Sequence, residues 1–199
     1  TYNDQIGLNL KGNTYEAAMK YGFNYRKVLP LKPGFYQARI AVREDGSGRV
    51  GTAAKWTEIP DMDKKQLMLS SILLSSEDAQ YATPGPQGEA GYQMRATSVS
   101  RRFRPNTNLD FLVFTYNAQA AKGEPDLVIQ SQVYAGSKLV YASPLARMAI
   151  AQNSDPLRIP YAARISLDGF TAGEYELKLL VIDRATKMTA NRRINFSVE

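Results

Sequence analysis

The stretch Gly34-Phe-Tyr-Gln-Ala-Arg-Ile-Ala-Val-Arg43 decides the fold, because its pattern is written a second time further along the chain. It aligns without a gap on Gly173-Glu-Tyr-Glu-Leu-Lys-Leu-Leu-Val-Ile182, and the match continues to residues 59 and 198. An internal repeat of this kind constrains the architecture before any local assignment is made. The sequence therefore predicts two copies of one structural unit.

Each copy predicts an antiparallel hairpin. Apolar and polar side chains alternate through residues 34–43, which is typical of a half-buried strand. Residues 44–48 favour a turn, and residues 50–59 return as the partner strand. The second copy predicts the same hairpin over residues 175–198. We expect Tyr36 and Tyr175 to occupy equivalent places, each with its hydroxyl bonded back to the backbone as in immunoglobulin-like sandwiches.

Further strands are indicated between the two hairpins. Alternation and turn signals place them at about 66–75, 92–100, 108–118, 126–135, 138–142 and 159–167. The 108–118 strand carries apolar side chains on both faces, which indicates a central, buried strand. A first strand is expected at about 5–10 and a short helix at about 14–20. A helical turn is a further prediction within the loop that contains residues 145–151.

These features predict an all-β protein made of two tandem immunoglobulin-like antiparallel β-sandwich units, the first of them N-terminally incomplete. The repeat extends upstream, where residues 25–31 align on 161–167. Five strands fit before that point in the second copy, but only one fits in the first. We therefore expect a partial unit over residues 1–62 and a complete one over 63–199. The missing strands would lie upstream or come from another chain, leaving an exposed sheet edge.

The composition excludes most catalytic classes. The 199 residues include no Cys and no His, so imidazole-based nucleophilic sites, thiol chemistry and disulfides are impossible. Zinc and redox metals are held mostly by the same two residue types. Carboxylate pairs such as Glu44 with Asp45, and Glu174 with Glu176, fall in turns or on polar strand faces, where acids are solvated. We expect no enzyme activity and no cofactor.

The charge pattern gives no strong ligand signal. The formal charge is +6, and the dense basic cluster is Arg101, Arg102 and Arg104. A solvated strand end explains this cluster better than a phosphate-binding patch, so we expect no nucleic acid partner. Asp61 and Asp63 fall between the two units, where a calcium ion is the alternative to a plain linker. No stretch approaches the roughly 20 apolar residues of a membrane helix.

An aromatic series precedes the first hairpin. Tyr21, Phe23 and Tyr25 alternate, which predicts that they share one face of a strand. Aromatic residues at alternate strand positions usually belong to a core, but in an incomplete unit part of this series would be exposed. Together with Arg101, Arg102 and Arg104, these three residues form the predicted interaction surface.

Several segments resemble one protein family. They are residues 31–43, 47–51, 58–61 and 67–74, followed by Arg101-Arg-Phe103, Leu109-Asp-Phe111 and Tyr116-Asn-Ala118. This series resembles the C-terminal region of acidobacterial proteins with a von Willebrand factor A-related domain, and it covers nearly the whole chain. The resemblance implies an exported, envelope-associated protein in the periplasm, on the cell surface or outside the cell. The A domain and its metal-coordinating Asp-x-Ser-x-Ser motif are absent from this chain, so no functional residue carries over.

The sequence thus predicts a non-catalytic structural or protein-interaction module of a secreted or envelope-associated bacterial protein. Its expected partner is another protein or another domain of the same polypeptide. A carbohydrate-binding module is the alternative, with a glycan as its ligand. The two differ in one observable, because a carbohydrate module should bind discrete glycans saturably.

Overall fold

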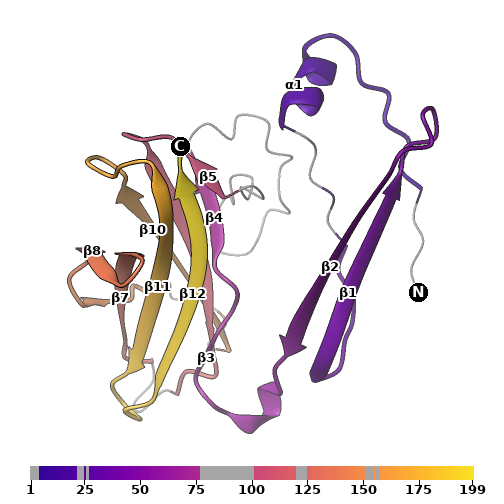
Figure 1. The fold of residues 1–199 in the computed structure, drawn as a ribbon. Coiled ribbons are helices and arrows are strands. Elements are labelled where there is room, and N and C mark those ends of the chain that lie inside the picture. The colour runs from indigo at the N-terminus through magenta and orange to yellow at the C-terminus, as the bar shows by residue number, and fades with distance from the viewer. Residues whose placement is uncertain are drawn as a thin grey trace.

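The computed structural model describes residues 5–21, 25, 27–76, 101–119, 125–150, 155 and 157–199. Among these residues, one short α-helix, α1 (Asn13–Tyr21), precedes segments that are mostly β-strand. The strands of the described residues form three sheets with two, four and six strands (Figure 1). The expectation of a mostly β protein with antiparallel sheets is therefore confirmed.

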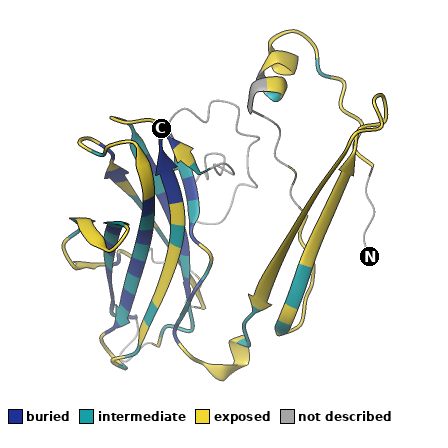
Figure 2. Cartoon of the chain, viewed as in Figure 1, coloured by how far each residue is buried: buried dark blue, intermediate teal, exposed yellow. Residues whose placement is uncertain are grey.

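The first sheet is a hairpin that stands by itself. Strands β1 (Gly34–Arg43) and β2 (Val50–Ile59) pair antiparallel along their whole length. A single 3-10 turn, η1 (Met62–Lys64), follows. Almost every residue of the hairpin is exposed, as Figure 2 shows. Within the described part of the chain, β1 pairs only with β2.

The four-stranded sheet is centred on β6 (Asn108–Tyr116). Strand β10 (Arg158–Ser166) pairs with one side of β6, and both β3 (Met68–Leu69) and β4 (Leu73–Ser76) pair with the other. Leu112 and Val113 point to opposite faces of β6, yet both are buried. The predicted central strand is thereby confirmed.

The six-stranded sheet has the order β5–β12–β11–β7–β8, with β9 also pairing with β7. Its strands are β5 (Arg102–Phe103), β7 (Leu127–Ala135), β8 (Lys138–Ala142), β9 (Ala146–Arg147), β11 (Gly173–Asp183) and β12 (Thr189–Val198). The short β5 runs parallel to β12, whereas the other pairs are antiparallel.

The two larger sheets face each other across one hydrophobic core (Figures 1 and 2). Alternate residues of each strand point inward, as expected for a two-layer arrangement. From β6 and β11 these are Leu109, Phe111, Val113, Leu177, Leu179 and Val181. Burying each such side chain stabilises the fold by about 1.5–3 kcal/mol. All the buried core residues of the described chain lie between Leu67 and Val198, so the first hairpin contributes none.

The two copies of the repeat form hairpins with the same register. Gly34 lies opposite Ile59, as Gly173 lies opposite Val198. At the turn ends, Arg43 lies opposite Val50 and Ile182 opposite Thr189. The turns also share a hydrogen bond: the Glu44 amide donates to the Arg49 carbonyl, and the Asp183 amide to the Met188 carbonyl, both at 2.9 Å. The predicted equivalence of the hairpins is confirmed.

The two tyrosines make the same bond. The Tyr36 hydroxyl donates to the Lys32 carbonyl at 2.9 Å, and the Tyr175 hydroxyl donates to the Thr171 carbonyl at 2.7 Å. Two residues before each tyrosine, Gly34 and Gly173 have φ of +149° and +157°, values that favour glycine. The prediction that each hydroxyl is bonded back to the backbone is confirmed.

Some local predictions differ from the structure. The helix expected at 14–20 is present as α1, but residues 5–10 form no strand. Ile6 and Leu8 alternate as in a strand and remain exposed, because no sheet edge receives them. The prediction of a helical turn at 145–151 is wrong for residues 145–150, the part of this range that is described. There the chain forms β9, whose two residues pair with Val128 and Ile129 of β7.

The strand predicted at 66–75 is divided into β3 and β4. Ser70 lies at the break, where its amide donates to the Phe114 carbonyl and its hydroxyl accepts from the Phe114 amide. The side-chain bond takes the place of a backbone partner and interrupts the ladder. The strand predicted at 92–100 lies outside the described residues.

Candidate functional site

Of the predicted aromatic strand face, neither described residue lies in a strand. Tyr21 is the last residue of α1, and Tyr25 lies outside any helix or strand with 53% of its surface exposed. Phe23 lies outside the described residues. The run from Tyr15 to Lys20 contains strong helix formers, and their propensity outweighs the period-two spacing of the aromatic residues. An interaction role for these residues stays a prediction.

Arg101, Arg102 and Arg104 lie on and beside β5, at the edge of the six-stranded sheet. The Arg101 carbonyl accepts from the Ser197 amide at 2.9 Å, and the Arg102 Nε lies 3.5 Å from Glu199 Oε1. The Arg104 carbonyl accepts from the Thr107 hydroxyl at 2.7 Å. The cluster thus fixes the end of β5 against β12 through its backbone. Its role in binding a partner stays a prediction.

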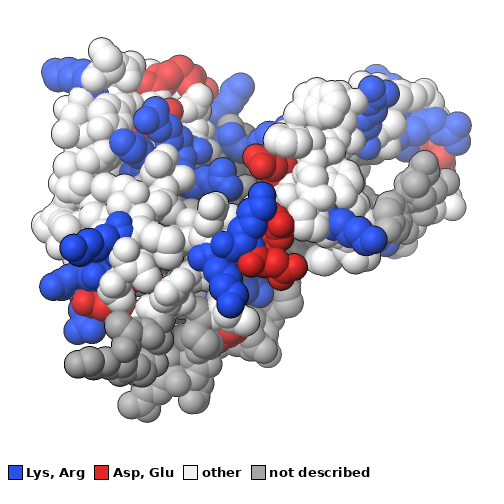
Figure 3. All heavy atoms as spheres, turned by 90° about the horizontal axis from the view of Figure 1, so that it is seen from below, with Lys and Arg blue, Asp and Glu red and all other residues white. Residues whose placement is uncertain are grey.

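Basic and acidic side chains mix over the surface. Figure 3 views the molecule from below, and on that face Lys and Arg lie in several separate places with acidic groups beside some of them. Some of these charges form ion pairs between neighbouring strands. Arg164 donates to Asp110 through two bonds of 2.6 and 3.0 Å, and the Arg193 guanidinium lies 3.3 Å from the Glu176 carboxylate. Exposed pairs of this kind add little stability, about 0–1 kcal/mol each.

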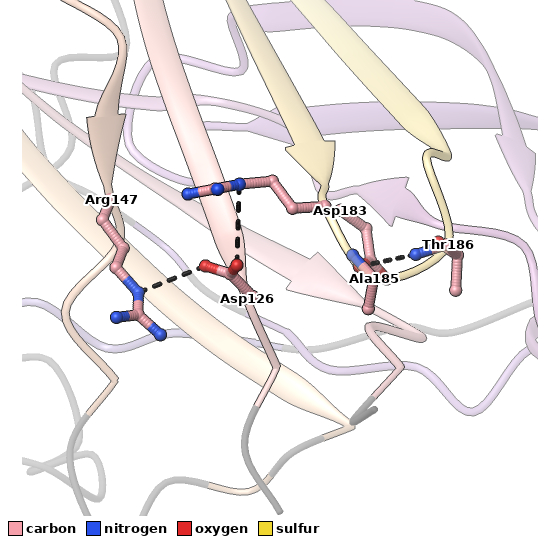
Figure 4. A network of polar contacts seen from close by, with 6 residues as sticks. Asp126, Arg147, Asp183, Ala185 and Thr186 are labelled. Atoms are coloured by element: carbon pink, nitrogen blue, oxygen red, sulfur yellow. Dashed lines mark hydrogen bonds and ion pairs between the residues drawn. The ribbon is translucent and has the colours of Figure 1, made fainter. Parts of the chain in front are cut away.

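Among the described residues, the most deeply buried acid is Asp183, at the end of β11 (Figure 4). Its Oδ1 accepts from the amides of Ala185 and Thr186 at 2.9 and 3.3 Å, and its Oδ2 accepts from the Gln119 amide at 3.2 Å. Three backbone donors offset the cost of removing a carboxylate from water. The geometry assigns Asp183 to stabilising the β11–β12 turn and holding the segment before β7.

Asp126 completes the polar network of Figure 4. Its carboxylate lies 3.2 Å from the Arg147 Nε and 3.6 Å from the Arg184 Nε. The Arg184 amide also donates to the Asp126 carbonyl at 2.9 Å. These contacts join the start of β7 to β9 and to the β11–β12 turn. Sequence reasoning missed both acids, although the alignment of Asp183 on Glu44 marked a position at the start of a turn.

Asp61 and Asp63, the residues considered for a calcium site, lie in a segment that is held by hydrogen bonds. Asp61 caps η1, because its Oδ1 accepts from the Asp63 amide at 3.1 Å. The Asn117 side chain donates to the carbonyls of Met62 and Gln66 and fixes the same segment. Calcium requires 6–8 oxygen ligands. In the described ranges, no group of three or more His, Cys, Asp or Glu side chains is placed to hold a metal ion.

The hairpin β1–β2 is the most unusual surface of the described chain. One face exposes Ile40 and Val42 at 62% and 59%, although the equivalent Leu179 and Val181 of β11 are completely buried. The opposite face exposes Phe35 and Trp56, at 79% and 69%. A hollow of about 400 Å³ lies at mid-hairpin, lined by Arg39, Ile40, Ala41, Thr52, Ala53 and Ala54. We call these exposed side chains of β1 and β2 the hairpin surface, and it is the candidate site.

Sequence reasoning predicted an exposed sheet edge in this unit but not the exposed aromatic residues on the hairpin surface. No helix among the described residues is long and apolar enough to cross a membrane. No protein-family model matches this chain, and a search of curated proteins finds no significant match.

Proposed function

We propose that residues 63–199 form an immunoglobulin-like β-sandwich and that the hairpin surface is an interaction arm carried beside it. Three features support the first part. The order β3/β4–β6–β10 in one sheet and β5–β12–β11–β7–β8 in the other fits an immunoglobulin-like arrangement. Tyr175 makes the backbone bond of a tyrosine corner at the start of β11. Adjacent strands of the chain also cross between the two sheets, as from β6 to β7.

The observation that carries the function is the exposure of large apolar side chains on the hairpin surface. Soluble monomers rarely expose contiguous apolar patches unless a partner covers them. Aromatic residues such as Phe35 and Trp56 are also enriched at the centres of protein interfaces. The activity supported best is therefore protein binding without catalysis. From the resemblance to the von Willebrand factor A-related proteins, we propose that this binding takes place at the cell envelope or outside the cell.

A photo-crosslinking experiment tests this proposal. A photoreactive phenylalanine analogue replaces Trp56 in one variant and Leu157, which is 65% exposed beside β10, in the control. Each variant is irradiated with an envelope extract of the source organism. We expect a discrete cross-linked protein with the analogue at position 56 and none at position 157. Equal or absent cross-linking at the two positions would contradict the proposal.

A carbohydrate ligand is the second candidate, because exposed rings such as Trp56 can stack on sugars. A glycan array separates the two. Saturable binding to particular glycans that disappears in Trp56→Ala would identify the hairpin surface as a sugar site. An array without saturable signals favours a protein partner.

A further inference from the structure

We infer that the hairpin surface accepts an extended strand of a partner protein, which pairs antiparallel with residues 37–44 along the edge of β1 and its turn, on the side away from β2. The inference rests on the proposed function of the hairpin as an interaction arm, and it names the chemistry of the partner. Strand addition of this kind combines main-chain hydrogen bonds with side-chain pockets at alternate positions.

The second copy of the repeat shows what belongs on this edge. Strand β11 is paired with β12 on one side and with β7 on the other. Strand β1 has the same register with β2, but within the described residues no strand occupies its other side. In β11 the β7 partner runs antiparallel from the position opposite Glu176 to the position opposite Asp183. The aligned positions in β1 and its turn are Gln37 and Glu44. The expected partner strand therefore pairs with residues 37–44 of this chain.

The inner face of the partner strand must be apolar. On β7, Val133 and Ile129 lie opposite Leu177 and Val181, and all four are buried. The aligned positions in β1 are Ala38 and Val42, with Ile40 between them. Val42 and Ile40 are mostly exposed, so apolar partner residues at alternate positions would remove their surface from water. Ala53, which lies opposite Ile40 on this face, is small and leaves room for a larger partner side chain.

The outer face of the partner strand must be acidic. Arg39 and Arg43 occupy the outer face of β1, where β11 carries Lys178 and Ile182. The Arg39 Nε donates to Gln37 Oε1 at 2.7 Å, and the Arg43 Nη2 lies 3.4 Å from Asp45, with both Arg43 and Asp45 largely exposed. Opposite charges directly across an antiparallel pair are favourable, and like charges are unfavourable. The partner is therefore an extended strand that alternates apolar and acidic residues.

Synthetic peptides with the sequence of residues 126–135 test this inference, because this segment contains β7, which pairs with β11. One version carries Glu in place of Gln132 and Val128, which the repeat places opposite Arg39 and Arg43. A matched version carries Lys at both positions, and a third carries Pro in place of Ile129 and Val133. Binding to the full chain is followed by the fluorescence of Trp56, the single tryptophan, and by NMR shifts of the β1 amides.

We expect the Glu peptide to bind saturably and on the order of fivefold more tightly than the Lys peptide. The Pro peptide should not bind, because proline cannot donate to a strand ladder. In the protein variant Arg39→Glu/Arg43→Glu the preference should reverse toward the Lys peptide. This exchange of charges is on the surface and preserves the hairpin. A preference that stays the same in the variant, or binding that shifts β8 rather than β1 amides, would overturn the inference.

The outcomes separate this inference from the proposed function. Cross-linking of a partner at position 56 without any peptide binding along β1 would retain the interaction arm and reject strand addition. Peptide binding along β1 without a cross-linked partner would retain the strand-accepting edge and reject the proposed function. A dimer in light scattering that Arg39→Glu/Arg43→Glu dissociates would replace the partner protein by a second copy of this chain.

Discussion

At the scale of single residues, the two repeats place the same chemical group in two different environments. The Tyr175 ring is buried, with its centroid 5.6 Å from that of Phe196 and 5.2 Å from that of Phe170. The Tyr36 ring makes the same backbone bond at a more exposed site. Hydrogen bonds contribute more when their loss leaves a buried group without a partner.

Removing each hydroxyl should therefore have unequal effects. Tyr175→Phe is expected to lower the free energy of unfolding by about 1–1.5 kcal/mol, because the Thr171 carbonyl loses its donor in a partly buried place. Tyr36→Phe should leave the same quantity unchanged within error. Urea denaturation followed by circular dichroism measures both variants. Equal losses would mean that burial does not determine the strength of this bond.

The buried Asp183 permits a second comparison. Asp183→Ala leaves the amides of Ala185, Thr186 and Gln119 without their acceptor, so the free energy of unfolding should fall by about 3 kcal/mol or more. Glu44, at the aligned position, is exposed, and Glu44→Ala should unfold at the same urea concentration as the parent protein. A mild effect of Asp183→Ala would show that water reaches these amides.

At the scale of elements, the internal repeat and the alternation of apolar and polar residues predicted the two hairpins. The hairpins were predictable because alternation, turn residues and the repeat agree at each position. Strands β5 and β9 were not, because two residues carry no periodicity and these strands exist only where β12 and β7 supply their partners. Similarly, Tyr21 alternates with its aromatic neighbours, but local helix propensity determines its conformation.

The candidate site was predictable only in part. The repeat indicated that an edge near residues 34–43 would lack neighbours, and among the described residues no strand other than β2 pairs with β1. The exposure of Trp56 was not predictable, because it depends on what covers β2 and not on the pattern of β2 itself. Asp183 was missed for the same reason, since a carboxylate at a turn reads as solvated until the Gln119 amide is placed beside it.

The hairpins should also differ in their local stability. Amides in residues 36–43 are expected to exchange with deuterium faster than amides in 175–182, because β11 lies between two strands and over a core. A two-stranded hairpin is only marginally stable by itself. Hydrogen exchange with mass spectrometry on a monomeric sample measures both segments. Equal protection would mean that β1 gains its stability from contacts outside those described.

At the scale of the whole molecule, burial is unevenly distributed. The single tryptophan lies in the hairpin, which contributes no residue to the described core. Trp56 belongs to the hairpin, whereas the core residues lie between Leu67 and Val198. The tryptophan emission of the native protein should therefore resemble that of tryptophan in water and change little in urea. Near-ultraviolet circular dichroism of the tyrosines should show the cooperative transition of the core. Coincident transitions from both probes would show that the hairpin is packed.

The composition gives a second prediction for the molecule as a whole. A chain without His and Cys should retain no stoichiometric zinc, iron or copper after dialysis. Elemental analysis by mass spectrometry measures this directly. One such ion per chain would overturn the non-catalytic interpretation.

The common register of the two hairpins also bears on the order in which strands assemble. The uncovered hairpin has the same pairing as the covered one, so the turn over residues 44–49 or 183–188 aligns the strands without help from a core. Gly48 and Lys187 both adopt left-handed backbone conformations at the aligned turn position, with φ of +69° and +62°. Hairpins close within about 1–10 μs, before distant segments arrive. We therefore expect this hairpin to pair early in folding and later strands to add to it, whether or not they belong to the same chain.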